Sequence, residues 1–162
     1  MKRAIPAILI LASAALVQAA WVNYKAPSFS MDFPTTPTTQ EMNTPVQGVS
    51  VKTRTYSAQV NGSLCLVTCS ELPSSVSSKD MGNFSKSYID SFVRSAKATE
   101  TSRKTIFIHG YSGQEARFKI GNKVGSVWSF PSGRIGYGIA VLSTAKDFEA
   151  MRSKAFNSFH AR

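Results

Sequence analysis

The sequence predicts an α+β fold in which a central antiparallel sheet of about six to seven strands lies between helices. Three observations support this class. A hairpin signal surrounds Asn61-Gly62, a second run of short strands extends from Thr105 to Ser143, and two segments have helical periodicity. One helical segment lies in the middle of the chain and the other at its end, so the helices can cover a single sheet.

The N-terminal half contains four strand-like segments: Trp21–Tyr24, Phe29–Phe33, Val49–Val60 and Ser63–Leu72. The last two flank Asn61-Gly62, a dipeptide typical of two-residue hairpin turns that need positive φ at both positions. Between the strands, Thr35–Pro45 is rich in Thr and Pro and has no apolar period. This composition predicts a loop.

Two amphipathic helices are expected. The first starts at Ser77, which together with Asp80 three residues on resembles a capping box, and its apolar residues from Met81 to Ala96 share one face. The second begins near Thr144 and presents an apolar face formed by Phe148, Met151, Ala155, Phe156 and Phe159. Each apolar face should pack on the sheet.

The segment between the helices predicts an antiparallel meander with strands near 105–111, 114–120, 124–130 and 134–143. Its expected turns lie at Gly113, at Gly121-Asn122 and at Pro131–Gly133. Gly136 and Gly138 fall within the last strand, where glycine marks a bulge or close packing against another element.

Residues 1–19 have the pattern of a secretory signal peptide. Lys2 and Arg3 precede a short apolar run, and Val17–Ala19 offers small residues for cleavage after Ala19, with Ala20 as the alternative. The apolar run is shorter than the roughly 20 residues that span a bilayer, which disfavours a membrane anchor. No cysteine lies near the cleavage site. We therefore expect a periplasmic or secreted mature chain without a transmembrane segment.

Residues 20–162 are the size of one domain. They contain 17 basic and 9 acidic residues, a net charge of +8. Residues 97–162 alone have 11 basic and 4 acidic side chains, a net charge of +7. The positive charge therefore belongs mainly to the second half of the domain.

Three short strings, together with the order of the elements, resemble a known group. Phe29–Pro34 (FSMDFP), Gly110–Glu115 (GYSGQE) and Phe156–Phe159 (FNSF) are similar to the PsbP-like superfamily, over roughly Trp21 to Phe159. The resemblance implies an antiparallel sheet between helical layers. It implies little about function, because the group includes a photosystem II extrinsic protein, a yeast Ran-binding import factor and a bacterial envelope lipoprotein. No site residue can be carried over from it.

Cys65 and Cys69 are the only cysteines, and two cysteines in an exported protein suggest a disulfide. Both lie in one predicted strand, where four residues span roughly 13 Å, about twice the Cα separation that a disulfide allows. We expect two reduced, buried thiols. Hairpin register places Cys69 opposite Arg54, and a nearby cation favours a thiolate, so Cys69 is the more reactive thiol if either is.

The sequence does not predict an enzyme. His109 and Glu115 are the nearest approach to an acid–base pair, but a structural histidine is the better interpretation of His109. The nine carboxylates are scattered, and neither a phosphate loop nor a nucleophile elbow occurs. No cofactor or metal is expected. A thiol-dependent or hydrolytic enzyme is the least favoured class.

The remaining signal is a group of cations on or near the predicted meander: Arg103, Lys104, Arg117, Lys119, Lys123 and Arg134. Aromatic residues are interleaved with them: Tyr111, Trp128, Phe130 and Tyr137. The functional hypothesis is a basic sheet face or edge that binds an acidic protein or an anionic envelope component. A merely solubilising surface and a small-ligand pocket between sheet and helix are the alternatives. Export and the lack of a recognition motif argue against nucleic acid.

Overall fold

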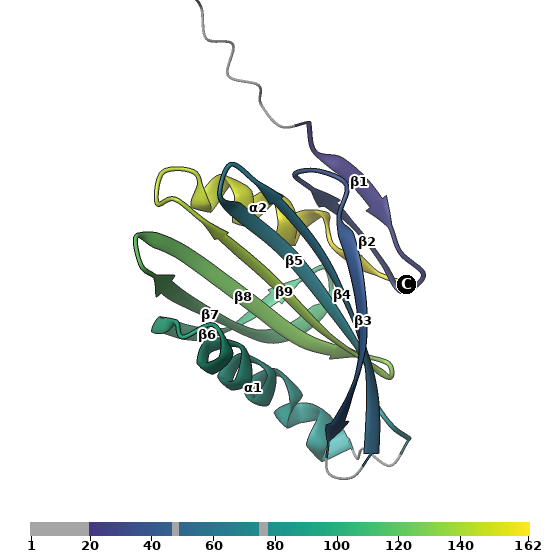
Figure 1. Ribbon diagram of the computed structural model, residues 1–162. Helices are drawn as coiled ribbons and strands as arrows, with labels where there is room; N and C mark the ends of the chain where they lie inside the picture. Colours follow the sequence, from purple (N-terminus) through teal and green to yellow (C-terminus); the bar gives the residue numbers. More distant parts are fainter. Residues whose placement is uncertain (1–19, 47–48, 75–77) are drawn as a thin grey trace, which may run out of the picture.

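The structure is a computed structural model that describes residues 20–46, 49–74 and 78–162 (Figure 1). The predicted signal peptide at 1–19 and the predicted cap residue Ser77 lie outside the described residues.

Most strands belong to one antiparallel seven-stranded sheet with the order β3-β4-β5-β9-β8-β7-β6. Its strands are β3 (Thr38–Val46), β4 (Val49–Val60), β5 (Ser63–Glu71), β6 (Thr99–Ile108), β7 (Tyr111–Ile120), β8 (Lys123–Ser132) and β9 (Ile135–Ser143). β5 and β9 pair at the centre, so the N-terminal hairpin and the C-terminal meander form one continuous sheet.

A helix covers each face of this sheet. α1 (Ser78–Ser95) packs on β7, β8 and β9 (Figure 1). On the opposite face, α2 (Phe148–Ser158) packs on β8 and β9 and contacts a small antiparallel sheet of β1 (Val22–Lys25), β2 (Phe29–Phe33) and β10 (His160–Ala161). The predicted α+β class is thus confirmed, with the small second sheet as an addition.

The hairpin around Asn61-Gly62 is confirmed in detail. Val60 pairs with Ser63, and Asn61 and Gly62 both have positive φ, at 50° and 75°. A two-residue turn of this kind matches the twist of the strands on either side of it.

Two predicted loops or turns are wrong. Thr35–Pro45 is mostly strand, because Thr38 to Val46 pair with β4 along its length. β3 is an edge strand with exposed side chains in its described part, so it lacks the apolar alternation that identifies a half-buried strand. The predicted turn at Gly113 instead forms at His109-Gly110.

Gly113 is buried inside β7, where close packing leaves no room for a larger side chain. A Cβ at this position would lie 2.3 Å from the Ser129 carbonyl oxygen and 2.8 Å from Trp128 Nε1.

The second helix starts later than predicted, at Phe148. Thr144, the predicted start, instead donates a hydrogen bond to the Asp147 carboxylate over 3.1 Å. Its predicted apolar face is confirmed, since Phe148, Met151, Ala155, Phe156 and the following Phe159 are buried.

Glycines in β9 allow α1 to approach the sheet closely. A Cβ at Gly136 would lie 2.1 Å from the Phe84 ring, and one at Gly138 would lie 2.1 Å from the Tyr88 ring. The Tyr88 hydroxyl also accepts a hydrogen bond from Thr68 over 2.6 Å. The expected role of these glycines in close packing is therefore observed.

Candidate functional site

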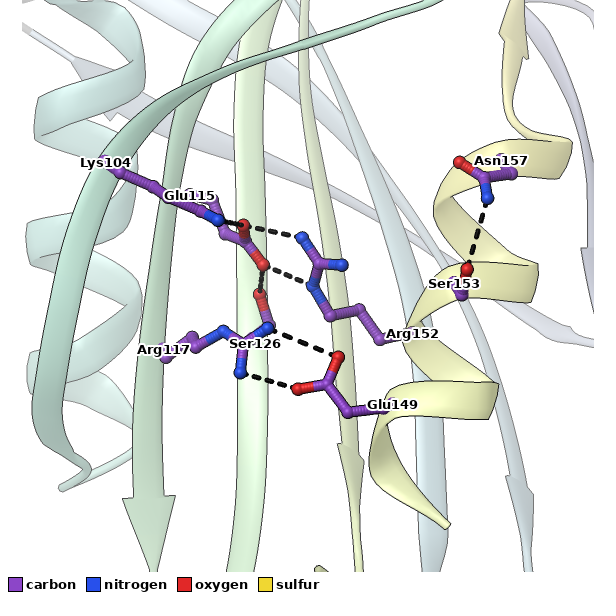
Figure 2. A network of polar contacts seen from close by, with 8 residues as sticks. All are labelled: Lys104, Glu115, Arg117, Ser126, Glu149, Arg152, Ser153 and Asn157. Atoms are coloured by element: carbon purple, nitrogen blue, oxygen red, sulfur yellow. Dashed lines mark hydrogen bonds and ion pairs between the residues drawn. The ribbon is translucent and has the colours of Figure 1, made fainter.

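Three of the six predicted cations share one face of the sheet. Arg117 and Lys119 alternate with the buried Phe118 on β7, and Lys104 on the neighbouring β6 pairs with Glu115. This is the face on which α2 packs (Figure 2). We call Lys104, Arg117 and Lys119 the β6–β7 cation surface.

The three cations differ in how strongly the protein holds them. Arg117 donates two hydrogen bonds to the Glu149 carboxylate of α2, over 2.6 and 3.3 Å (Figure 2). The Lys104 side chain is 59% exposed, and its ammonium lies 3.8 Å from the Glu115 carboxylate. Lys119 is exposed and has no ion-pair partner among the described residues. Lys119 is therefore available to an external anion.

The other three predicted cations lie elsewhere, so the six residues do not form one surface. Arg103 follows the alternation of β6 to the opposite face, where it pairs with Asp90 of α1 and with Glu100, at 2.7 and 2.6 Å. Lys123 is the first residue of β8, and Arg134 lies beyond its other end, in the turn before β9; they donate to the Gly62 and Pro73 carbonyl oxygens, respectively. Sequence proximity grouped side chains that strand alternation and strand length separate.

The aromatic residues expected among the cations are part of the core. Trp128, Phe130 and Tyr137 are at most 1% exposed, and Tyr111 is partly buried and stacks on Phe130. Phe159 fits among them, with ring centroids 5.3 to 6.5 Å away. Aromatic side chains of the protein itself therefore fill this space between the sheet and α2. A small-ligand pocket between sheet and helix was one of the alternatives drawn from the sequence.

A buried ion pair joins β7 to α2 beside the cation surface, and it was not among the predictions from the sequence. The Glu115 side chain is fully buried, and both its oxygens accept hydrogen bonds from Arg152, one over 2.6 Å (Figure 2). Ser126 donates to the same carboxylate over 2.5 Å. Burial, the largest single influence, raises the pKa of Glu115, but the hydrogen bonds from Arg152 and Ser126 together with the charges of Arg152 and Lys104 outweigh it, so the pKa is lowered.

The sequence does contain a signal for this pair. Arg152 lies four residues from both Phe148 and Phe156, so helical periodicity places it on the buried face of α2. An arginine among buried residues needs a carboxylate partner. Glu115, two residues before Arg117 on the same strand face, is such a partner.

The suggested acid–base pair of His109 and Glu115 is not formed. His109 lies in the β6–β7 turn, whereas Glu115 pairs with Lys104, four residue pairs beyond the Ile108–Tyr111 pair that closes the turn. His109 instead contacts the backbone carbonyl of Asn157 through Nε2, over 2.6 Å. Among the described residues, no group of three or more His, Cys, Asp or Glu side chains could hold a metal ion.

Both cysteines are free and buried, and each faces the aromatic core. Burial raises the pKa of Cys65 to about 12 and that of Cys69 to about 11. Arg54 does pair with Cys69 in the strand register, but its guanidinium is bound to the Glu41 carboxylate over 2.7 Å. The Ser28 hydroxyl, 3.6 Å from Cys69 Sγ, and Arg54 offset only part of the effect of burial.

We expect the native protein to resist thiol alkylation. At pH 8, thiols with pKa values of about 11 and 12 are almost entirely protonated and unreactive. Iodoacetamide labelling followed by mass spectrometry should show slow modification of the folded protein and rapid modification of both cysteines in denaturant. Rapid labelling of Cys69 in the folded protein would instead restore the hypothesis of a reactive thiol.

Within residues 20–46, 49–74 and 78–162, no helix is long and apolar enough to cross a membrane. No family model matches the sequence, and no curated protein sequence matches it. A solved structure does match: the solution structure of cyanobacterial PsbP (CyanoP) from Synechocystis sp. PCC 6803 is similar to this chain with a TM-score of 0.60 and 11% sequence identity. The match covers 91% of this chain and 96% of the cyanobacterial chain. The protein therefore has a PsbP-like fold, as the short strings at Phe29–Pro34, Gly110–Glu115 and Phe156–Phe159 implied.

Proposed function

We propose that this protein is an exported, extracytoplasmic accessory domain that binds an acidic protein through the β6–β7 cation surface. The observation that carries the proposal is the exposure of Lys119 without an ion partner among the described residues, beside Arg117 and Lys104. The charged, apolar and small-residue segments of positions 1–19 support export. The similarity to cyanobacterial PsbP supports an accessory role by fold analogy alone.

The charge balance of this face favours an acidic partner. Glu115 is fully buried and held by Arg152, so Glu149 is the exposed carboxylate that competes for the cations of the surface. Side chains two residues apart on a strand face are separated by roughly 6.6 Å, so Arg117 and Lys119 could contact neighbouring carboxylates of one partner segment. Attraction of this kind is strongest at low ionic strength.

Charge reversal on the surface should weaken partner binding strongly. We expect the variant Lys104→Glu/Lys119→Glu to lose at least about tenfold in affinity for an acidic partner, because like charges replace opposite ones. The measurement is crosslinked copurification with envelope proteins, followed by titration of the recovered partner at increasing salt. The matched control is Lys25→Glu/Lys86→Glu, which makes the same charge change at exposed lysines of β1 and α1.

Equal loss in both double variants would mean that binding follows net charge rather than this surface. Recovery of no partner above background would contradict the accessory function. Suppose that the wild-type protein binds anionic lipid vesicles and no protein partner is recovered. The partner would then be an anionic envelope component rather than an acidic protein.

A further inference from the structure

The only two histidines of the chain lie side by side, although they are 51 positions apart in the sequence. His109 is in the β6–β7 turn and His160 begins β10. Their ring centroids are 4.6 Å apart, and both residues are exposed. Neither residue belongs to the β6–β7 cation surface.

The hydrogen bond of His109 uses one ring nitrogen and leaves the other free to bind a metal ion. The Asn157 carbonyl oxygen can only accept, so His109 Nε2 carries a proton and donates it over the 2.6 Å contact. In the neutral ring, the lone pair is then on Nδ1. Metal-binding histidines commonly donate their other N–H to a backbone carbonyl in this way, which fixes both tautomer and ring orientation.

The backbone conformation at His109 also sets where its side chain leaves the turn. His109 has φ of +51°, a left-handed conformation that Asn, Asp and His adopt more often than other non-glycine residues. The strand pair Ile108–Tyr111 closes the turn around it. The turn therefore presents the imidazole from a defined backbone position towards the end of α2 and the start of β10.

The separation of the rings fits a shared metal ion. A metal bound to an imidazole nitrogen at about 2.0–2.1 Å lies roughly 3.2 Å from the ring centroid. Two such rings with centroids 4.6 Å apart correspond to an N–metal–N angle of about 90°, which suits adjacent positions around Cu²⁺ or Ni²⁺. The His109 ring is held by its hydrogen bond to Asn157, so alignment of the nitrogens falls to the exposed His160 ring.

We propose that His109 and His160 form a binding site for a divalent transition-metal ion, with water completing the coordination. Imidazole suits Cu²⁺, Ni²⁺ and Zn²⁺ and gives little affinity for Mg²⁺ or Ca²⁺, which prefer oxygen ligands. Cu²⁺ binds most tightly in the usual order of these ions. With two protein ligands, the site takes up metal reversibly and connects the β6–β7 turn to the C-terminal strand β10.

Isothermal titration calorimetry tests this site, using residues 20–162 without a histidine tag and with Cu²⁺, Ni²⁺, Zn²⁺ and Mg²⁺ as separate probes. We expect one ion per chain for the first three and no binding of Mg²⁺. Substoichiometric Cu²⁺ should broaden the NMR signals of both imidazole rings before those of other side chains. Because the protein has no other histidine, these signals report on the proposed site alone.

Two single variants show whether both rings contribute. His109→Asn tolerates the positive φ of the turn, and His160→Gln keeps a polar side chain at the start of β10. Each should retain the melting temperature of the metal-free protein and weaken Ni²⁺ binding about tenfold or more. Undiminished Ni²⁺ affinity in either variant, or equal affinity in the wild type and the double variant, would overturn the proposal.

Discussion

Replacing Arg152 with methionine is expected to lower the free energy of unfolding by about 3–5 kcal/mol at pH 7. The variant removes the two hydrogen bonds that hold the Glu115 carboxylate and leaves this fully buried charge with Ser126 and the more distant Lys104 ammonium. Methionine fills much of the arginine volume, so the loss reports on the uncompensated charge rather than on a cavity. Urea unfolding monitored by tryptophan fluorescence measures this loss in the free energy of unfolding.

The pH dependence of this variant should have the opposite sign to that of the wild type. In the wild type the pKa of Glu115 is lowered from 4.5, so its contribution is present above that value and is lost as pH falls through the lowered pKa. Without Arg152, we expect burial to outweigh the remaining Ser126 and Lys104 and to raise the pKa of Glu115. The variant should therefore gain stability relative to the wild type as pH falls from 7 towards 5.

A neighbouring ion pair supplies the control. Arg117 and Glu149 join the same strand and helix, but their side chains are 36% and 60% exposed. Arg117→Met should cost only about 0–1 kcal/mol, since water solvates the carboxylate left behind. Equal losses in Arg152→Met and Arg117→Met would contradict the distinct role of the buried pair.

Gly138→Ala should lower the free energy of unfolding by about 1–3 kcal/mol through overpacking. The new methyl group would lie 2.1 Å from Tyr88 Cζ and 2.3 Å from its hydroxyl, so α1 or the ring must move. Movement of the ring also strains the Thr68–Tyr88 hydrogen bond. Chemical denaturation measures the loss, and hydrogen exchange should show weaker protection in α1 than in the wild type.

A double-mutant cycle separates this steric effect from a general effect on β9. In a Tyr88→Ala background the methyl group at position 138 has room, so Gly138→Ala should cost much less than in the wild type. The same loss in both backgrounds would show that the close approach of Tyr88 is not the reason for glycine at this position.

Local sequence signals predicted the parts of the fold that short-range physics determines. The hairpin turn needs two residues with positive φ, and Asn61 and Gly62 are residue types that adopt this conformation readily. β3 was missed because edge strands are exposed and lose the alternation on which prediction depends. Its antiparallel pairing with β4 is local, starting at Val46 and Val49, but the Thr- and Pro-rich composition of the segment does not indicate it.

The candidate surface was predicted only in part for a similar reason. Two-residue alternation correctly placed Arg117 and Lys119 on one face, because both are on one strand. It could not exclude Lys123 and Arg134, whose carbonyl partners at Gly62 and Pro73 are about 60 residues away along the chain. The proximity of His109 to His160 likewise depends on β10 joining β2, which no local pattern indicates.

Site-specific photocrosslinking tests the proposed accessory function most directly. A photoreactive residue at position 119 should crosslink to an acidic envelope protein in intact cells, whereas the same residue at position 86, on exposed α1, should not. The crosslink at 119 should fall as ionic strength rises. A crosslink at 86 but not at 119, or crosslinking at 119 that is indifferent to salt, would contradict binding through the β6–β7 cation surface.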